Sequence, residues 1–351
     1  MSEHPTGSRP KATGNEPGRS AGGGLPVKDR AITPFDLHGL KTYELLTRPS
    51  KVFVEDLGRP VAPDARLADW LDALPRQLAG QDLRAARDHI CRAHRAGAMV
   101  AAALGGHVIK TGCGPYLVDW IERGLVTAVA LNGAAAIHDF ELALVGKTSE
   151  DVAAQLPTGR FGMARETADA FAVAAQIGAA DGCGLGHALG RHLAACHCRH
   201  PETSVVLAAY RAGIPCTIHV ALGTDIVHMH PHVSGAALGE ASLIDFRLLC
   251  TVVSRLKAGV WMNLGSAVIL PEVFVKAVSV CRNFGHDLDG LVAINLDKQV
   301  QYRSRVNVLD RPATHGLELL GHHEILLPLL HAAVACALAA GEGTRPLRRA
   351  A

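Results

Sequence analysis

One segment, from Gly105 to Gly146, constrains the fold of this chain more than any other, because helix and strand signals alternate closely within it. Pro115 suits the first turn of a helix, where its missing N–H would have no partner anyway, and Gly124 ends that helix. Residues 125–131 are almost wholly apolar, which is typical of a parallel strand buried on both faces. Asn132-Gly133 breaks this run and starts a second helix. The segment predicts a helix N-terminus at the carboxyl end of a strand, where α/β sheets bind phosphates and nucleotides.

The same alternation continues toward the C-terminus. Strands that alternate with helices predict an α/β fold with a parallel sheet and helices on both faces. We expect extended segments at 107–110, 125–131, 216–222, 260–264 and 291–296, and helices at 83–104, 161–180, 205–212, 241–256, 274–284 and 324–339. Each later strand ends in small or polar residues, which we expect to line one edge of the sheet: Asn132-Gly133, Thr224-Asp225, Gly265-Ser266-Ala267, and Asn295 with Asp297.

The glycine-rich stretch 181–190 lacks the spacing of a dinucleotide-binding loop. Its glycines stand at 182, 184, 186 and 190, which is not the G-x-G-x-x-G pattern, and no buried strand precedes them. We therefore expect a loop between two helices here.

Composition defines the boundaries and the setting. Residues 1–26 and 342–351 are predicted disordered tails, since they hold too little apolar surface to offset the entropy of ordering. Residues 27–341 are expected to form a single α/β domain whose N-terminal part is a helical cap that includes 67–74. The net charge of +2 and the few aromatic residues argue against nucleic-acid binding. Nine cysteines without a disulfide framework indicate the cytoplasm, and we expect no membrane association.

Three histidines at a spacing of two, His228, His230 and His232, form the first candidate for chemistry. In an extended chain this spacing places the three imidazoles on one side, as a metal site requires. The alternative is that they are hydrogen-bonded residues of a loop. We keep a metal site at His228 and His230 as a second hypothesis. The cluster His192 to His200 also contains possible ligands, but a helix end without a second ligand pair favours a structural role.

Two further pairs could move protons or bind an amine. His322 and His323 precede Glu324 at the expected start of the last helix, and histidine titrates near neutrality. His138-Asp139 follows the Asn132-Gly133 turn, where a carboxylate beside an imidazole could bind a cationic amine. For both pairs the alternative is a structural one, in helix capping or in a loop.

Taken in order, four correspondences, which together comprise five segments of residues 41–339, resemble the deoxyhypusine synthase family. GGHVIKTGCGPYLVDWIERGLVTAVALNGAAAIHDFE stands where that family has its threonine-serine-asparagine and threonine-alanine-glycine-glycine motifs. GIPCTIHVALGTDIVH matches its strand ending in threonine-aspartate-glycine, and VWMNLGSAVILPEVFVKAVSVCRN its glycine-rich strand and following helix. LVAINLDKQV and LLGHHEILLPLL match the last strand motif and the C-terminal end.

The resemblance implies a Rossmann-like fold, a homotetramer and NAD as cofactor. It implies transfer of an aminobutyl group from spermidine or a similar polyamine to an acceptor amine, either a protein lysine or a small amine. It places NAD along ten residues: Asn132, Gly133, Ala134, Thr224, Asp225, Gly265, Ser266, Ala267, Asn295 and Asp297.

The chain departs from the family at its catalytic lysine. The matching position reads Leu320-Gly321-His322, and an imidazole cannot form the covalent imine that a primary amine forms. The family's acidic pair is replaced here by Ile137-His138, so that only Asp139 remains as a carboxylate. The leading hypothesis is an NAD-dependent transferase in which Asp139 holds a substrate ammonium and His138, His322 and His323 move protons. The alternatives are a metal-dependent enzyme and a non-catalytic dinucleotide-binding protein.

Overall fold

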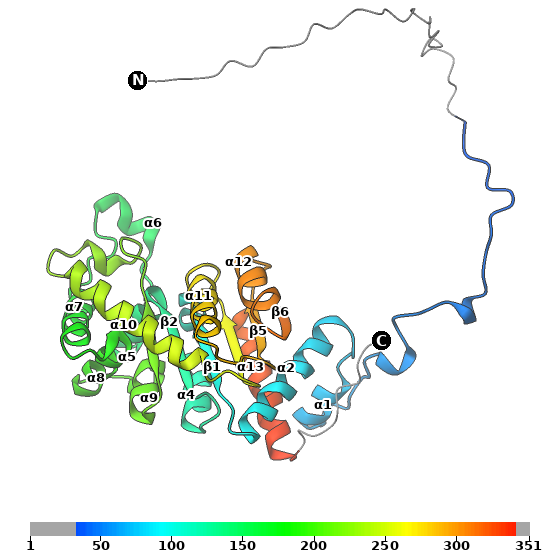
Figure 1. The fold of residues 1–351 in the computed structure, drawn as a ribbon, viewed down its shortest axis with the longest axis horizontal. Coiled ribbons are helices and arrows are strands. Elements are labelled where there is room, and N and C mark those ends of the chain that lie inside the picture. The colour runs from blue at the N-terminus through cyan, green and yellow to red at the C-terminus, as the bar shows by residue number, and fades with distance from the viewer. Residues whose placement is uncertain (1–32, 342–351) are drawn as a thin grey trace, which may run out of the picture. The chain divides into compact units, whose positions relative to one another are not determined.

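The computed structural model of the protein describes residues 33–341, so both predicted tails lie outside the described residues. The chain divides into two compact units, Met1–Lys51 and Val52–Ala351. In the first unit, residues 33–51 are exposed throughout and contain one 3-10 turn, Leu45–Thr47. Every α-helix and strand of the described residues belongs to the second unit (Figure 1).

A six-stranded parallel sheet forms the centre of the second unit. Its strands are β1 (Val100–Leu104), β2 (Ala128–Asn132), β3 (Cys216–His219), β4 (Val260–Leu264), β5 (Val292–Asp297) and β6 (His315–Leu320). They lie in the order β3-β2-β1-β4-β5-β6, and every neighbouring pair is parallel. This is the strand order of the dinucleotide-binding Rossmann fold, so the predicted fold class is confirmed.

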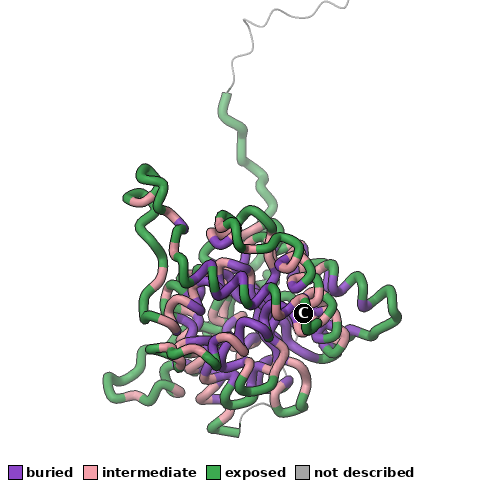
Figure 2. Tube along the Cα trace, turned by 90° about the vertical axis from the view of Figure 1, so that its left-hand side faces the viewer, coloured by how far each residue is buried: buried purple, intermediate pink, exposed green. Residues whose placement is uncertain are grey.

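Helices cover both faces of the sheet. They are α1 (Leu67–Ala73), α2 (Leu78–Arg95), α3 (Gly106–Lys110), α4 (Gly114–Glu122), α5 (Gly133–Val145), α6 (Val152–Gln155), α7 (Arg165–Ala180), α8 (Gly184–Ala195), α9 (Val205–Ala212), α10 (Gly235–Val253), α11 (Ile269–Asn283), α12 (Tyr302–Ser304) and α13 (His323–Ala339). Val100, Ala102 and Leu104 of β1 pack in one apolar core with residues of α2, α4, α5 and α13. Ala101 and Ala103 point to a second core with α10 and α11. Figure 2 shows the buried residues gathered in the interior between these layers.

The first strand was not predicted, because its sequence resembles a helix. Residues 83–104 were expected to form one helix, but α2 ends at Arg95 and β1 starts at Val100. The break falls at Gly97, which has a φ of +64° and so ends the helix in a conformation that glycine adopts most easily. Helix propensity favours alanine, yet the three alanines of β1 lie between two neighbouring strands. Sheet pairing on both sides outweighs a propensity of less than about 1 kcal/mol per residue.

Two other assignments were also wrong. Residues 107–110 form the short helix α3 and not a strand, since β1 has already ended at Leu104. The glycine-rich stretch 181–190 is largely helical, because α8 begins at Gly184. A Cβ on Gly186 would lie 2.1 Å from the carbonyl oxygen of Cys216, so this glycine allows α8 to pack directly on β3. The edge strand β6 was missed because much of it is exposed and its sequence is not strongly apolar.

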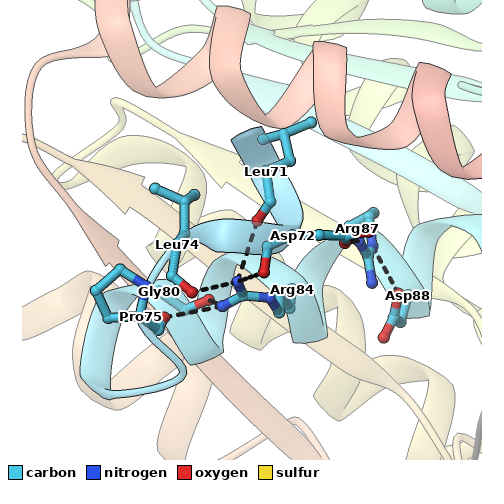
Figure 3. Close-up of polar contacts among 8 residues, drawn as sticks. All are labelled: Leu71, Asp72, Leu74, Pro75, Gly80, Arg84, Arg87 and Asp88. Atoms are coloured by element: carbon cyan, nitrogen blue, oxygen red, sulfur yellow. Dashed lines mark hydrogen bonds and ion pairs between the residues drawn. The ribbon is translucent and has the colours of Figure 1, made fainter. Parts of the chain in front are cut away.

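The predicted helical cap packs on the C-terminal helix, since α1 contacts α13. Arg84 of α2 holds the two N-terminal helices together (Figure 3). Its guanidinium donates to the carbonyl oxygens of Leu71 (3.0 Å), Leu74 (2.5 Å) and Pro75 (2.8 Å), with further bonds to Asp72 and Gly80. A cation beside the last carbonyls of α1 satisfies groups that a helix end leaves without partners.

Within residues 33–341, no helix combines the length and the hydrophobicity needed to cross a membrane.

Candidate functional site

The carboxyl ends of the six strands meet at one edge of the sheet, and the predicted site residues follow these ends. The chain places β2 and β3 on one side of β1, and β4, β5 and β6 on the other. Ligands of open α/β sheets bind in the crevice where the order reverses, here between β1 and β4. Four helices, α3, α5, α11 and α13, start just after β1, β2, β4 and β6, so their free N–H groups lie at this edge.

Two glycines lie between the ends of β1 and β4, where the strand order reverses. Gly105 donates its N–H to Leu264 O at 2.9 Å, and Gly265 donates to Leu296 O at 2.9 Å. A Cβ on Gly105 would lie 2.0 Å from the carbonyl oxygen of Gly265, so a side chain cannot be placed there. Gly265 has a φ of +65°, a conformation that favours glycine. The backbones of β1 and β4 therefore come together at the position where a ligand would sit.

Beside these glycines lies a buried imidazole without a partner. His323 is 2 % exposed, and within the described residues neither of its ring nitrogens has a hydrogen-bond partner. The ring of His107 lies edge to face against it, with centroids 5.2 Å apart. Burial lowers the pKa of His323, while the carboxylate of Asp297 and the backbone carbonyl of Leu296 act in the opposite direction. An unpaired buried polar group costs about 1–3 kcal/mol, so a ligand group that completed its bonding would be favoured.

The two adjacent histidines have different surroundings. His322 is the N-cap residue of α13, and its side chain is 55 % exposed with Glu324 Oε1 3.5 Å away. His323 is the next residue, and its ring turns into the interior. The motif resemblance pointed to His322, whereas burial favours His323 as the imidazole of the crevice.

His138 lies at the edge and Asp139 does not. The His138 ring is half-buried and lies near Gly106, since a Cβ on that glycine would be 3.2 Å from His138 Cδ2. Asp139 is fully buried, and its carboxylate accepts bonds from Ser204 Oγ (2.5 Å), Val205 N (2.7 Å) and Val206 N (3.3 Å). Burial raises the pKa of Asp139 to about 6. The carboxylate thus anchors the start of α9, and binding a substrate ammonium would require these bonds to break.

Several of the predicted cofactor residues also hold the edge itself together. Asn132 Oδ1 accepts from Ala135 N at 2.9 Å and so caps α5, where Gly133 and Ala134 form the first turn. Ser266 Oγ accepts from Leu270 N at 3.2 Å in the first turn of α11, next to the half-buried Ala267. These bonds fix the first turns of both helices at the crevice.

A buried polar network lies below the edge on the face of α11. Asn263 donates through Nδ2 to Asn295 Oδ1 (2.7 Å) and to Ser266 O (3.0 Å), and Ser304 Oγ donates to the same Ser266 carbonyl. Asn263 Oδ1 and Asn295 Nδ2 have no partner among the described residues. The network supports the Gly265-Ser266 turn from below. Asn263 was missed in the sequence, although an asparagine inside the apolar run VWMNL was the available signal.

Thr224 and Asp225 follow β3. Thr224 is exposed, and its hydroxyl donates to Ala221 O at 2.7 Å. Asp225 is the N-cap of the 3-10 helix Ile226–Met229. Its Oδ2 lies so near the start of α5 that a Cβ on Gly133 would be 2.0 Å away. Burial raises the pKa of Asp225, and His228 acts against this rise. A carboxylate therefore stands beside the β2–α5 turn.

The histidines of the proposed metal site are directed to different partners. His228 Nδ1 accepts from Gly223 N (3.0 Å) and Asp225 N (3.1 Å). The Nε2 atom of His230 lies 2.9 Å from Gly162 O, and that of His232 lies 2.9 Å from Asp169 Oδ1. Across residues 33–341 no group of three or more His, Cys, Asp or Glu side chains converges as a metal site would require. This geometry gives no support to the hypothesis of a metal-dependent enzyme.

The edge fits a dinucleotide in three respects. Helix N-termini suit a pyrophosphate, and the strand order creates a crevice for it. Asp225 and Asp297 supply carboxylates, of which Asp297 is the last residue of β5 and is 8 % exposed. Apart from these three features, His323 offers two unpaired ring nitrogens for a group other than the dinucleotide. His107 was not among the predicted site residues, although it directly follows the Gly105-Gly106 pair that marks this turn.

No protein-family model matches the sequence, and no curated protein matches it either. Solved structures do resemble the fold. AgrE, in its ternary complex with ornithine and NAD+, superposes with a TM-score of 0.50 at 13 % identity, over 74 % of this chain and 34 % of AgrE. A protein assigned as LOR/SDH from Methanococcus maripaludis S2 gives 0.47 at 17 % identity, over 75 % and 71 % of the two chains.

A protein assigned as a deoxyhypusine synthase from Entamoeba histolytica gives a TM-score of 0.44 at 10 % identity, over 80 % of this chain and 96 % of that protein. The chain spans about a third of the length of AgrE. At these identities the likeness concerns the fold alone.

Proposed function

We propose that this protein is an NAD-dependent transferase that oxidises a polyamine such as spermidine and passes its aminobutyl group to an acceptor amine, a protein lysine or a small molecule. The observation that carries the proposal is the buried, unpaired imidazole of His323 at the reversal point of a Rossmann strand order. The substrate class comes from the five segments that resemble deoxyhypusine synthases.

NAD would supply the hydride acceptor for oxidation of the amine. The first turns of α3, α5, α11 and α13 would face its phosphates. Asp225 and Asp297 would accept hydrogen bonds from ribose hydroxyls, as carboxylates at strand ends commonly do. Asn132, Ser266 and Asn295 would act mainly by holding these turns in place, since their side chains already bond to the protein.

The absence of a lysine after Gly321 changes the transfer step. A histidine cannot form a Schiff base with the aminobutyl group. The acceptor amine would therefore attack the oxidised carbon directly, without a covalent enzyme intermediate. The other amine of the polyamine would leave, and the new imine would be reduced by the NADH from the first step. His323 would hold or move a proton next to the reacting carbon. The exposed His322 would move protons between the site and solvent. As in the family that the motifs resemble, the expected assembly is a homotetramer.

The proposal is tested in two steps on the full chain. Calorimetry with NAD+ and NADH measures cofactor binding, and NADH absorbance then reports oxidation of spermidine, putrescine or ornithine. His323→Gln should lower turnover by roughly a hundredfold, the usual worth of an acid or base, and leave NAD affinity nearly unchanged. His286→Gln is the matched control, because His286 is an exposed histidine that follows α11. Binding of NAD without oxidation of any amine would favour the non-catalytic dinucleotide-binding alternative, and absence of binding would contradict the proposal.

A further inference from the structure

A chain of side-chain hydrogen bonds runs from α7 and α5 to the ring of His138. Thr167 Oγ1 donates to Glu141 Oε1 at 2.9 Å, and Thr148 Oγ1 donates to Glu141 Oε2 at 2.5 Å. Thr148 Oγ1 also lies 2.8 Å from His138 Nδ1. Glu141 stands three residues after His138 on α5, while Thr148 lies in the segment that follows this helix. Both oxygens of the carboxylate are therefore used, one of them toward the histidine.

This chain determines which ring nitrogen of His138 carries the proton. A threonine hydroxyl has one hydrogen, and that of Thr148 points to the carboxylate of Glu141. The hydroxyl can then only accept from His138, so Nδ1 carries the hydrogen of the neutral ring. The other nitrogen, Nε2, is left with a free lone pair.

The free nitrogen lies at the candidate site. Cδ2, the carbon bonded to Nε2, is 3.2 Å from the position that a Cβ of Gly106 would take. Gly106 begins α3, which starts just after β1, at the point where the strand order reverses. No hydrogen bond to Nε2 is formed by the described residues, and the residue is only half-buried. A group bound beside Gly106 would therefore lie next to this side of the ring.

We propose that Glu141 and Thr148 are positioning residues that hold His138 in the Nδ1–H form, so that Nε2 accepts a proton from a bound amine. The inference rests on the proposed function for the identity of the substrate. In that reaction the hydrogen of the substrate C–H bond would leave with the bonding electron pair as hydride, which bound NAD would accept, and the N–H proton would pass to His138 Nε2. The carbon–nitrogen double bond forms as both depart. The positive charge of the resulting imidazolium is stabilised through Thr148 by the Glu141 carboxylate.

The charged groups around the ring act in both directions. Burial lowers the pKa of His138, and Lys110 of α3 lowers it further. The Glu141 carboxylate faces the ring through Thr148, and His107 stands on the same helix as Lys110. The ring is thus neutral, and able to accept a proton, at all pH values above its lowered pKa. Turnover should fall as the pH drops through this value.

The protonation state can be measured without cofactor or substrate. Long-range 15N–1H spectra of protein labelled at histidine nitrogen distinguish the two neutral forms, and the His138 signals are those lost in His138→Gln. At pH 8 the wild type should show hydrogen at Nδ1. Thr148→Val has nearly the same shape but no hydroxyl, so it should lose this preference, and Thr148→Ser should restore it. Hydrogen at Nε2 in the wild type would overturn the proposal, whether or not the protein oxidises amines.

Kinetics provide the second measurement once a turnover assay exists. Thr148→Val should lower kcat by about tenfold or more and move the acidic limb of the pH profile to lower pH, because the imidazolium loses its support. Thr148→Ser should keep both the rate and the profile. Thr158→Val is the matched control, because the Thr158 hydroxyl is exposed and donates only to Gln155 O. An unchanged pH profile in Thr148→Val would also overturn the proposal.

Discussion

The carboxylate of Asp245, on α10, accepts a hydrogen bond from the backbone N–H of Gly186, on α8, at 2.9 Å. The same oxygen accepts from Ile218 N in β3 at 2.7 Å. One side chain therefore connects two helices to the edge strand of the sheet. The second oxygen, Oδ1, is buried and has no partner among the described residues. This carboxyl group is completely buried, and burial raises its pKa to about 7, against the effect of the backbone N–H groups.

The raised pKa predicts how the stability of the protein depends on pH. Because Asp245 binds its proton more tightly in the folded state, its favourable contribution is complete below about pH 4. It is lost as the pH rises toward 7. Asp245→Asn keeps an oxygen for the two N–H groups but cannot ionise. The variant should be more stable than the wild type at pH 8, by on the order of 1 kcal/mol or more, and this advantage should vanish near pH 4. Urea unfolding at both pH values measures it. An advantage that does not change with pH would contradict the assignment.

The second prediction concerns the cost of leaving His323 unpaired. His323→Leu replaces two unsatisfied ring nitrogens with an apolar side chain in a site that is 2 % exposed. We expect the free energy of unfolding to rise by about 1–3 kcal/mol, because a buried polar group without partners costs this much. Turnover should be lost in the same variant. Thermal and urea unfolding provide the measurement, and a destabilised variant would mean that the ring has bonding partners in the free protein.

The third prediction concerns Arg84. Its five bonds to carbonyl oxygens require the planar guanidinium, which presents donors in a fixed fork. Arg84→Lys keeps the charge but cannot reach the same set of acceptors. We expect a loss of about 1–3 kcal/mol in the free energy of unfolding, since hydrogen bonds from a charged group to part-buried carbonyls are lost. Arg92→Lys, at an exposed position of the same helix, is the control. Equal unfolding midpoints for the two variants would refute this role.

The fourth prediction concerns Asp225 and the cofactor. Asp225→Asn should keep the 3-10 helix that follows, because asparagine and aspartate cap helices about equally well. It removes the negative charge beside the β2–α5 turn. If Asp225 accepts from ribose hydroxyls, the affinity for NAD should fall by about tenfold. Calorimetry tests this, with Asp169→Asn as control, because Asp169 is an exposed carboxylate paired with His232. The same affinity in both variants would remove Asp225 from the cofactor site.

The sequence by itself determined the α/β class, most helices and strands from residue 125 onward except α8 and β6, and the residues at most strand ends. These signals are local. The apolar run 125–131 predicts a strand, and Asn132-Gly133 predicts where it ends. Both signals depend only on neighbours within a few residues. The start of α5, capped by Asn132, is an example that the structure confirms.

Only the tertiary structure decided the features that depend on distant partners. The helix propensity of the alanines in β1 predicts a helix, but pairing with β2 and β4 places them in a strand. Asp139 resembled an ammonium-binding carboxylate, yet its bonds go to Ser204, 65 residues away. The motif pointed to His322, but His323 is the ring that turns inward against Gly265 and His107. Burial and hydrogen-bond partners are properties of the packed chain, so adjacent and identical residues such as these two histidines cannot be told apart until the sheet has formed.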